Sequence, residues 1–160
     1  MRVANGLVRL LLRSPLHFLL SDDLLLLSYH GRLSGRQYTI PVSYSRAGDV
    51  VTVFTYRTWW RNLRDGAPVV VVLKRQRLQG LAEAICDDQA AIAEGLLAHL
   101  RQHPSLAKGY HVALRPDGRP DSDAVRQAAR FEVMVRIRLM PMQETGLTEQ
   151  ARTIMQGAAV

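Results

Sequence analysis

Two arginines, a serine and two glycines fall within the six residues 31–36, which read GRLSGR. Glycine permits a sharp turn, and backbone N–H groups in such a turn can converge on an anion. Guanidinium groups and a serine hydroxyl are donors that suit phosphate oxygens. The chemistry indicated is anion binding at a turn. Solvated arginines at the surface are the alternative interpretation of the same residues.

A second segment whose residues could bind a ligand is TWWRNLRDG, residues 58–66. From Trp59 it is long enough for two helical turns, and Gly66 is placed to end them. Neighbouring residues on a helix point in different directions, so at most one of Trp59 and Trp60 is expected to face a ligand.

The excess of basic over acidic residues lies in the first half of the chain. The net charge is +7, and residues 1–80 hold 12 basic against 4 acidic side chains, whereas residues 81–160 hold 9 against 10. An anionic partner of the first half is therefore expected: a phosphate-bearing cofactor, a membrane surface or a nucleic acid. Proteins that stack on bases interleave exposed aromatics with basic groups, and only 6% of residues here are aromatic, so no nucleic-acid partner is predicted.

Composition also indicates the cellular compartment and argues against a disulfide, a metal site and a membrane span. A single cysteine, Cys86, rules out an internal disulfide and fits a reducing compartment. The histidines are scattered without metal-ligand spacing, so no metal site is predicted. No apolar run reaches the roughly 20 residues of a membrane span, and no signal cleavage site precedes the first strand. We expect a cytoplasmic protein.

The first residues have an amphipathic pattern. Apolar and basic side chains separate onto two faces of a helix over residues 2–14, and Pro15 is expected to end it. Such a helix either lies against anionic lipid at the inner face of the membrane or packs on the domain. Periodicity fades after residue 140, and residues 141–160 are predicted to form a mobile tail.

Six segments have strand character, joined mainly by short turns. They are residues 23–30, 37–45, 50–56, 69–74, 78–86 and 130–140. Helices are predicted from Asp87 or Asp88 to residue 101, and over residues 121–130. Pro41 cannot donate to a ladder, so its strand is expected at an edge or a bulge. The pattern predicts an α+β fold: one domain over residues 1–140, a six-stranded, mainly antiparallel barrel with helices outside.

The residues around both motifs resemble a known family. LLLLSYHGRLSGRQYTIPVSY is similar to the strand–turn–strand signature of the deazaflavin-dependent nitroreductases, and TWWRNLRDGAPVVVVL resembles their W-x-x-N-L segment and the strand after it. The resemblance covers residues 24 to about 86. It implies a split β-barrel of the flavin-binding type, related to pyridoxamine-phosphate oxidases, that binds the deazaflavin coenzyme F420 or, in some relatives, flavin mononucleotide (FMN).

The resemblance also implies roles for individual residues. The turn residues Arg32, Ser34, Gly35 and Arg36 would hold the cofactor phosphate. Pro41 and Val42 of the second strand would lie near the ring, and Trp59 and Asn62 would close the opposite side. Two departures from the family pattern stand out. Leu33 occupies the position of the usual lysine, and the loop of residues 56–58 before Trp59 is short.

The implied activity is hydride transfer between reduced F420 and a quinone- or nitro-type acceptor. Hydride chemistry belongs to the cofactor, and an acceptor also needs a proton. Tyr44 is our candidate donor among Tyr38, Tyr44, Tyr56 and Tyr110. An FMN-dependent reductase, a non-catalytic flavin-binding protein and a nucleic-acid-binding barrel remain as alternatives. Because split barrels commonly pair, a homodimer is also expected.

Overall fold

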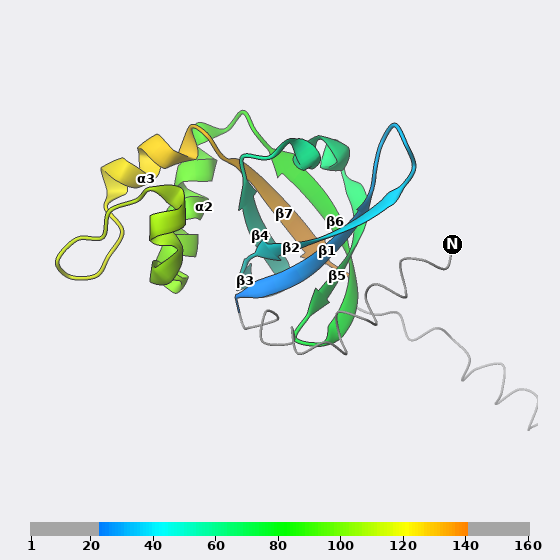
Figure 1. Cartoon of the computed structure of the whole chain (residues 1–160), viewed down its shortest axis with the longest axis horizontal. Coiled ribbons are helices and arrows are strands. Elements are labelled where there is room, and N and C mark those ends of the chain that lie inside the picture. Colours follow the sequence, from blue (N-terminus) through cyan, green and yellow to red (C-terminus); the bar gives the residue numbers. More distant parts are fainter. Residues whose placement is uncertain (1–22, 141–160) are drawn as a thin grey trace, which may run out of the picture.

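The computed structural model describes residues 23–140. The helix predicted at residues 2–14 and the tail predicted at residues 141–160 lie outside this range. Within it, one curled antiparallel sheet carries two α-helices at one end (Figure 1). This confirms the α+β split-barrel fold class.

The sheet has seven strands where the sequence predicted six. In chain order they are β1 (Leu24–His30), β2 (Gln37–Ser43), β3 (Ser45–Ala47), β4 (Val50–Thr55), β5 (Ala67–Leu73), β6 (Gln76–Ile85) and β7 (Val133–Leu139). Their order across the sheet is β2-β1-β5-β6-β7-β4-β3. Every pairing is antiparallel.

The additional strand arises where the barrel closes. The segment predicted as one strand over residues 37–45 divides at Tyr44, so that β2 and β3 become the two edges of the sheet although they follow each other in the chain. The Tyr44 side chain is buried, and its backbone N–H donates to the Asp23 carbonyl at 3.2 Å. Pro41 lies on the edge strand β2, opposite Leu26, which confirms the edge position predicted from the proline.

Apolar side chains on alternate positions of the strands fill the barrel interior. Leu25, Leu27, Val53, Val71 and Ile137 are fully buried there. Gly80 makes the close approach of β6 and β7 possible, because a Cβ at this position would lie 2.7 Å from the Ile137 Cγ2 and 3.0 Å from the Arg138 carbonyl oxygen.

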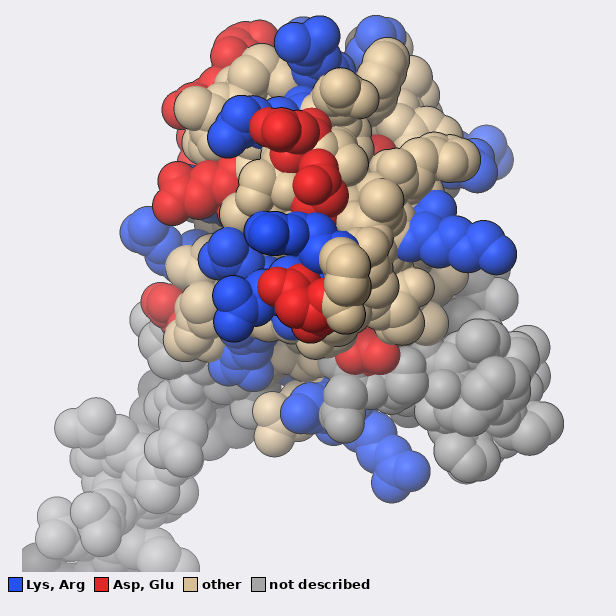
Figure 2. All heavy atoms as spheres, turned by 90° about the vertical axis from the view of Figure 1, so that its left-hand side faces the viewer, with Lys and Arg blue, Asp and Glu red and all other residues tan. Residues whose placement is uncertain are grey.

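A second apolar cluster lies between the sheet and the helices. These helices are α2 (Gln89–Gln102), η3 (Pro104–Tyr110) and α3 (Ser122–Ala129), whereas η2 (Thr58–Leu63) packs on the barrel core through Leu63. Both η2 and η3 are 3-10 helices. Asp88 caps α2 by accepting from the Ala91 N–H, and Asp121 caps α3 in the same way. Phe54 and Met134 face this cluster from β4 and β7. Figure 2 shows basic and acidic side chains intermingled on the helical end of the molecule.

The last strand begins later than the sequence predicted. Residues 130–132 are not part of β7, which starts at Val133, and Phe131 is 77% exposed where the alternation had predicted an inward side chain. The cause is local: the Phe131 and Glu132 N–H groups donate to the Ala128 and Ala129 carbonyls, so the chain continues the turn of α3 before it straightens.

We expect Gly80→Ala to destabilise the fold by about 1–3 kcal/mol, because the added methyl group must displace Ile137 or separate β6 from β7. Chemical denaturation measures this difference. Gly109→Ala is the control, since a Cβ there meets nothing within 4 Å. Equal effects of the two substitutions would contradict the packing argument.

Candidate functional site

The GRLSGR turn is a compact loop between β1 and β2. The Gly31 N–H donates to the Arg36 carbonyl at 2.8 Å, and the Gly35 N–H donates to the Gly31 carbonyl at 2.8 Å. Gly35 has φ +64°, a conformation that glycine adopts without strain. A Cβ at Gly31 would lie 2.6 Å from the Ser34 Oγ, so both glycines are needed for this loop shape.

The structure brings the two sequence motifs together. The Asn62 side chain, on η2, accepts from the Arg32 N–H at 3.0 Å and donates through Nδ2 to the Trp59 carbonyl at 3.0 Å. The Arg32 guanidinium also lies 3.6 Å from the Asp65 carboxylate. Residues about thirty positions apart in the chain therefore form one surface.

The donors left for an anion on this surface are mainly side chains. Four of the six turn N–H groups already donate within the two motifs: those of Gly31, Arg32, Gly35 and Arg36. The Ser34 Oγ accepts from the Arg36 N–H at 3.3 Å, which leaves its own hydrogen free to donate. Arg36 has no ion-pair partner within residues 23–140, and the exposed Arg32–Asp65 pair is long enough to exchange for a stronger anion.

A stack of three aromatic rings lies beside the turn. Tyr29 stacks on Tyr38 with ring centroids 5.6 Å apart and on Trp59 at 5.8 Å. Tyr29 is buried, and burial raises the pKa of its hydroxyl, with a smaller contribution from Tyr38. Tyr38 is 42% exposed, so the outermost ring of the stack is open to a planar ligand.

Trp60 has a different environment from Trp59. The Arg61 and Arg64 guanidinium groups lie 5.8 Å and 4.8 Å from the Trp60 ring centroid. Trp59 instead joins the tyrosine stack. Of the adjacent tryptophans, one supports the aromatic stack and the other organises surface cations.

The predicted ring contacts and proton donor lie farther along the chain. Pro41 is exposed, and Val42, on the opposite face of β2, packs against the barrel core. Tyr44 is 4% exposed and lies within that core. The structure therefore brings Arg32, Asn62 and Trp59 together but leaves the Tyr44 side chain inside the barrel.

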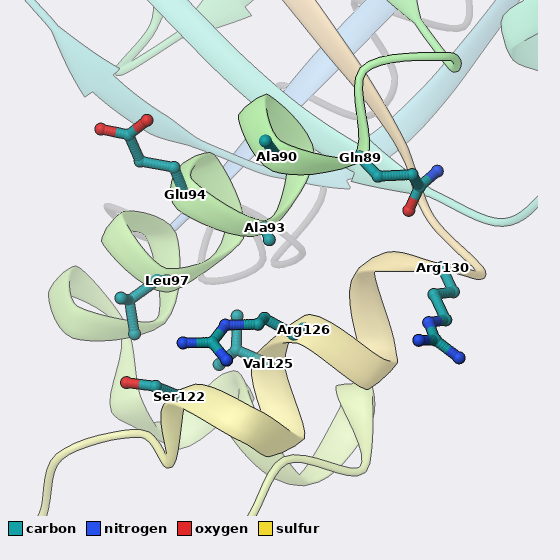
Figure 3. Close-up of a pocket in the computed structure, with 9 residues that line it drawn as sticks. All are labelled: Gln89, Ala90, Ala93, Glu94, Leu97, Ser122, Val125, Arg126 and Arg130. Carbon is teal, nitrogen blue, oxygen red and sulfur yellow. The ribbon is translucent and has the colours of Figure 1, made fainter.

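The cavities described near the helices lie away from the turn. One of about 490 Å³ is lined by Arg101, Pro104 and Arg119, and two others lie against α3. Of these two, one of about 660 Å³ lies between α2 and α3, where Ala90, Ala93 and Leu97 face Arg126 (Figure 3). The other, of about 410 Å³, lies among η3, α3 and the segment that leads into β7, and Glu132 lines it. None of the three is lined by residues of the GRLSGR turn.

Two buried titratable groups have strongly shifted pKa values. Burial raises the pKa of Glu132 from 4.5 to about 7, and its Oε2 has no hydrogen-bond partner. Burial, assisted by His103, lowers the pKa of His99 from 6.5 to about 4. Both groups are therefore neutral in the folded protein near pH 6.

The sequence did not point to three residues described above: Tyr29 and Asp65 beside the turn, and Glu132 at the cavity near α3. Tyr29 follows an apolar run and resembles an ordinary core residue, and Asp65 resembles a turn residue. Glu132 lies in a stretch that alternates with arginines, which is typical of a solvated strand face. The position of Asp65 two residues after the W-x-x-N-L segment was the one available signal.

Comparison with solved structures shows the fold that the sequence resemblance implied. A conserved hypothetical protein of Mycobacterium tuberculosis matches with TM-score 0.56 and 16% identity over 80% of this chain and 81% of its own. A candidate 5-nitroimidazole antibiotic resistance protein from Bacteroides thetaiotaomicron matches with TM-score 0.53 and 12% identity, covering 81% of each chain.

A third similar structure is the FAD and heme binding protein of Mycobacterium smegmatis. It matches with TM-score 0.51 and 21% identity over 80% of this chain and 66% of its own. At sequence identities this low, the structural matches show a shared fold alone. A scan against protein-family models and a search of curated proteins each found no match.

We expect Asn62→Ala to release the GRLSGR turn from η2, because it removes both hydrogen bonds of the side chain. The expected loss of stability is about 1–2 kcal/mol, and exchange of the Arg32 amide hydrogen should accelerate at least as much as that difference implies. Hydrogen exchange followed by NMR measures both. Ser34→Ala, which leaves the link intact, is the control. Unchanged protection of the Arg32 amide in Asn62→Ala would contradict the link.

We expect Glu132→Gln to change how stability depends on pH. A raised pKa means that the folded state holds the proton more tightly, so wild-type stability falls as the pH rises from about 4.5 to about 7. The glutamine variant lacks this fall and should gain about 3 kcal/mol relative to wild type at pH 8 compared with pH 4. Denaturation at several pH values measures the gain. The exposed Glu83→Gln should show none.

Proposed function

We propose that this chain is an oxidoreductase that binds a flavin-type cofactor, with coenzyme F420 as the first candidate and FMN as the alternative. The observation that carries the proposal is the link between the two motifs: Asn62 fixes the Arg32 backbone to η2, so that a cationic turn and an aromatic stack form one surface. The split-barrel fold supports it, because this fold is the one that the sequence resemblance implies.

The residues present suit an anionic tail followed by a planar ring. Arg36 and the free hydrogen of Ser34 would bind the phosphate, joined by Arg32 once it exchanges Asp65 for the ligand. Gly35 gives the loop its shape. The half-exposed Tyr38 ring offers a surface for stacking, and Trp59 supports that ring through Tyr29.

β2 would carry the ring itself. Pro41 and Val42 lie on opposite faces of this strand, so a ring against either face contacts one side chain directly and the other residue through its backbone. The cofactor, when bound, supplies the hydride that reduces a quinone- or nitro-type acceptor. The chain itself would bind, orient and exclude water, with Tyr44 as the proton donor proposed from the sequence.

F420 is preferred over FMN because of the surrounding cations. Its tail carries carboxylates beyond the phosphate, and exposed guanidinium groups surround η2: Arg57, Arg61 and Arg64. Two of them are held against Trp60, which reduces the entropy lost when they pair with an anion. FMN, with only its phosphate, would use fewer of these charges.

The partners proposed are a small electron acceptor, a second copy of the chain, and a membrane surface contacted through residues 2–14. No helix within residues 23–140 is long and apolar enough to cross a membrane. Cosedimentation of the full chain with anionic vesicles, with and without residues 1–14, tests the membrane contact. Sedimentation equilibrium tests the dimer.

We expect the protein to bind F420 more tightly than FMN, and Arg32→Ala/Arg36→Ala to weaken F420 binding by about 10–100-fold, since each charge-assisted hydrogen bond to phosphate contributes about 1.5–3 kcal/mol and the exposed site loses part of it to solvent. Fluorescence titration of the purified protein with each cofactor measures this. Arg115→Ala/Arg119→Ala removes the same charge from the exposed loop before α3 and is the control. Equal affinity in the double variant of the turn would overturn the phosphate assignment.

A further inference from the structure

The 410 Å³ cavity beside Glu132 has the composition of a small-molecule site. Its walls come from the residue after β4, the end of η3, the inner side of α3 and the segment before β7, including Tyr56, Tyr110, His111, Phe131 and Glu132. Its volume lies within the range of ligand pockets. Tyr56 and Tyr110 were considered as proton donors from the sequence, whereas His111, Phe131 and Glu132 were not assigned to a site.

Two large aromatic rings at this cavity are exposed. Tyr56 is 67% exposed and Phe131 is 77% exposed, although both line the cavity. The Arg57 guanidinium lies 5.5 Å from the Tyr56 ring centroid. Exposed aromatic rings at a concave surface favour a planar aromatic ligand.

Glu132 is the polar group of the cavity. Its side chain belongs to a residue only 9% exposed, and Oε2 has no hydrogen-bond partner. The titratable side chains that face it are Tyr110 and His111 from η3 and Tyr56 after β4, whereas α3 contributes the uncharged Ala124, Gln127 and Ala128. Arg130, two residues away, lines the 660 Å³ cavity (Figure 3).

A carboxyl group in these surroundings is mostly protonated below about pH 7 and can then donate a hydrogen bond. Burial without a cationic partner raises the pKa of Glu132 to about 7. Oε2 therefore carries either an unused donor or an unused acceptor. Of these, the protonated form is the one that burial favours, so a ligand with a carbonyl oxygen completes the site better than a cation does.

The cavity adjoins the strand expected to carry the cofactor ring. The Tyr110 hydroxyl lies near the Ser43 side chain, and Ser43 is the last residue of β2, directly after Val42. The cavity thus lies at one end of β2, and the GRLSGR turn lies at the other end.

We propose that this cavity binds the electron acceptor, a planar aromatic carbonyl compound of the quinone class, and that Glu132, in place of the Tyr44 expected from the sequence, donates a hydrogen bond and then a proton to its carbonyl oxygen. This rests on the proposed function. The reduced cofactor gives a hydride, hence two electrons, to the quinone and is oxidised. The Glu132 O–H bond breaks and an O–H bond forms on one acceptor oxygen. The hydride brings the second hydrogen, so the quinone, the hydride and this one proton together give the hydroquinone. The carboxylate regains a proton from water.

Binding is tested first, with the cofactor-free full chain and chromone, a planar aromatic ketone that does not react with the Cys86 thiol. Isothermal titration should show chromone binding about fivefold more tightly at pH 6 than at pH 9, because the hydrogen bond is lost when Glu132 ionises. Glu132→Gln retains an N–H donor, so its affinity should stay near the pH 6 value at both pH values. Glu132→Leu should weaken binding about fivefold at pH 6.

Phe131→Ala tests the cavity even if the Glu132 variants do not fold. The Phe131 ring is exposed, so its removal should leave the fold intact while weakening chromone binding severalfold. Arg126→Ala in the 660 Å³ cavity and Glu83→Gln on β6 are controls that should not change chromone binding. If chromone binding by Glu132→Gln still depends on pH, the pH dependence belongs to His111, and the role of Glu132 is overturned. Benzamidine, an aromatic cation, binding more tightly than chromone would overturn the carbonyl class, and no chromone binding would overturn the site.

Turnover is tested second, with the protein loaded with reduced F420. Glu132→Gln can donate a hydrogen bond but cannot give up a proton, so kcat for a quinone should fall about 10–100-fold while KM changes little. Unchanged kcat would overturn the proton-donor role. The two proposals fail separately: chromone binding without any F420 or FMN binding would leave the acceptor site and remove the cofactor, and the reverse result would remove only the acceptor site.

Discussion

The Asn62 carboxamide is the interaction on which the arrangement of the candidate site depends. Its oxygen accepts from the Arg32 N–H and its nitrogen donates to the Trp59 carbonyl, so the side chain needs both a donor and an acceptor. Aspartate would lack the donor, and a hydrophobic residue would lack both. This explains physically why an asparagine follows the tryptophan at this spacing. It also shows that the position of Arg32 is decided by η2 as much as by the GRLSGR turn.

Closure of the barrel gives β2 its two different ends. The chain passes from one edge of the sheet to the other at Tyr44, whose buried side chain and hydrogen bond to the Asp23 carbonyl fix the crossing. Just before this crossing, Ser43 meets Tyr110 of η3. At the far end of β2 lies the cationic turn, about 20 Å away for an extended strand of this length. One strand therefore connects an anion-binding surface with an apolar cavity.

The sequence predicted the features that depend on local pattern. Alternation located the strands, Asp88 and the preceding residue located the start of α2, and Pro41 located the edge strand. The break at Tyr44 was invisible because the alternation continues unchanged through it, and only closure of the sheet requires a change of partner. Phe131 was placed in the interior for the same reason: its spacing matches β7, but hydrogen bonds from α3 delay the strand.

The charged turn and the Glu132 carboxyl differ in burial: the turn arginines are exposed, and Glu132 is buried. The chain carries a net charge of +7, yet among residues 23–140 no arginine or lysine acts on the Glu132 carboxyl, and the helical end mixes both signs (Figure 2). A cation beside Glu132 would hold the carboxyl ionised and remove its ability to donate a proton. The arginines of the cationic turn, in contrast, are exposed to solvent, where an anionic tail can bind without a large desolvation penalty. A molecule lying along β2 would therefore meet positive charge at one end and a neutral acid at the other, which is the polarity required to hold a charged cofactor tail and protonate an uncharged acceptor.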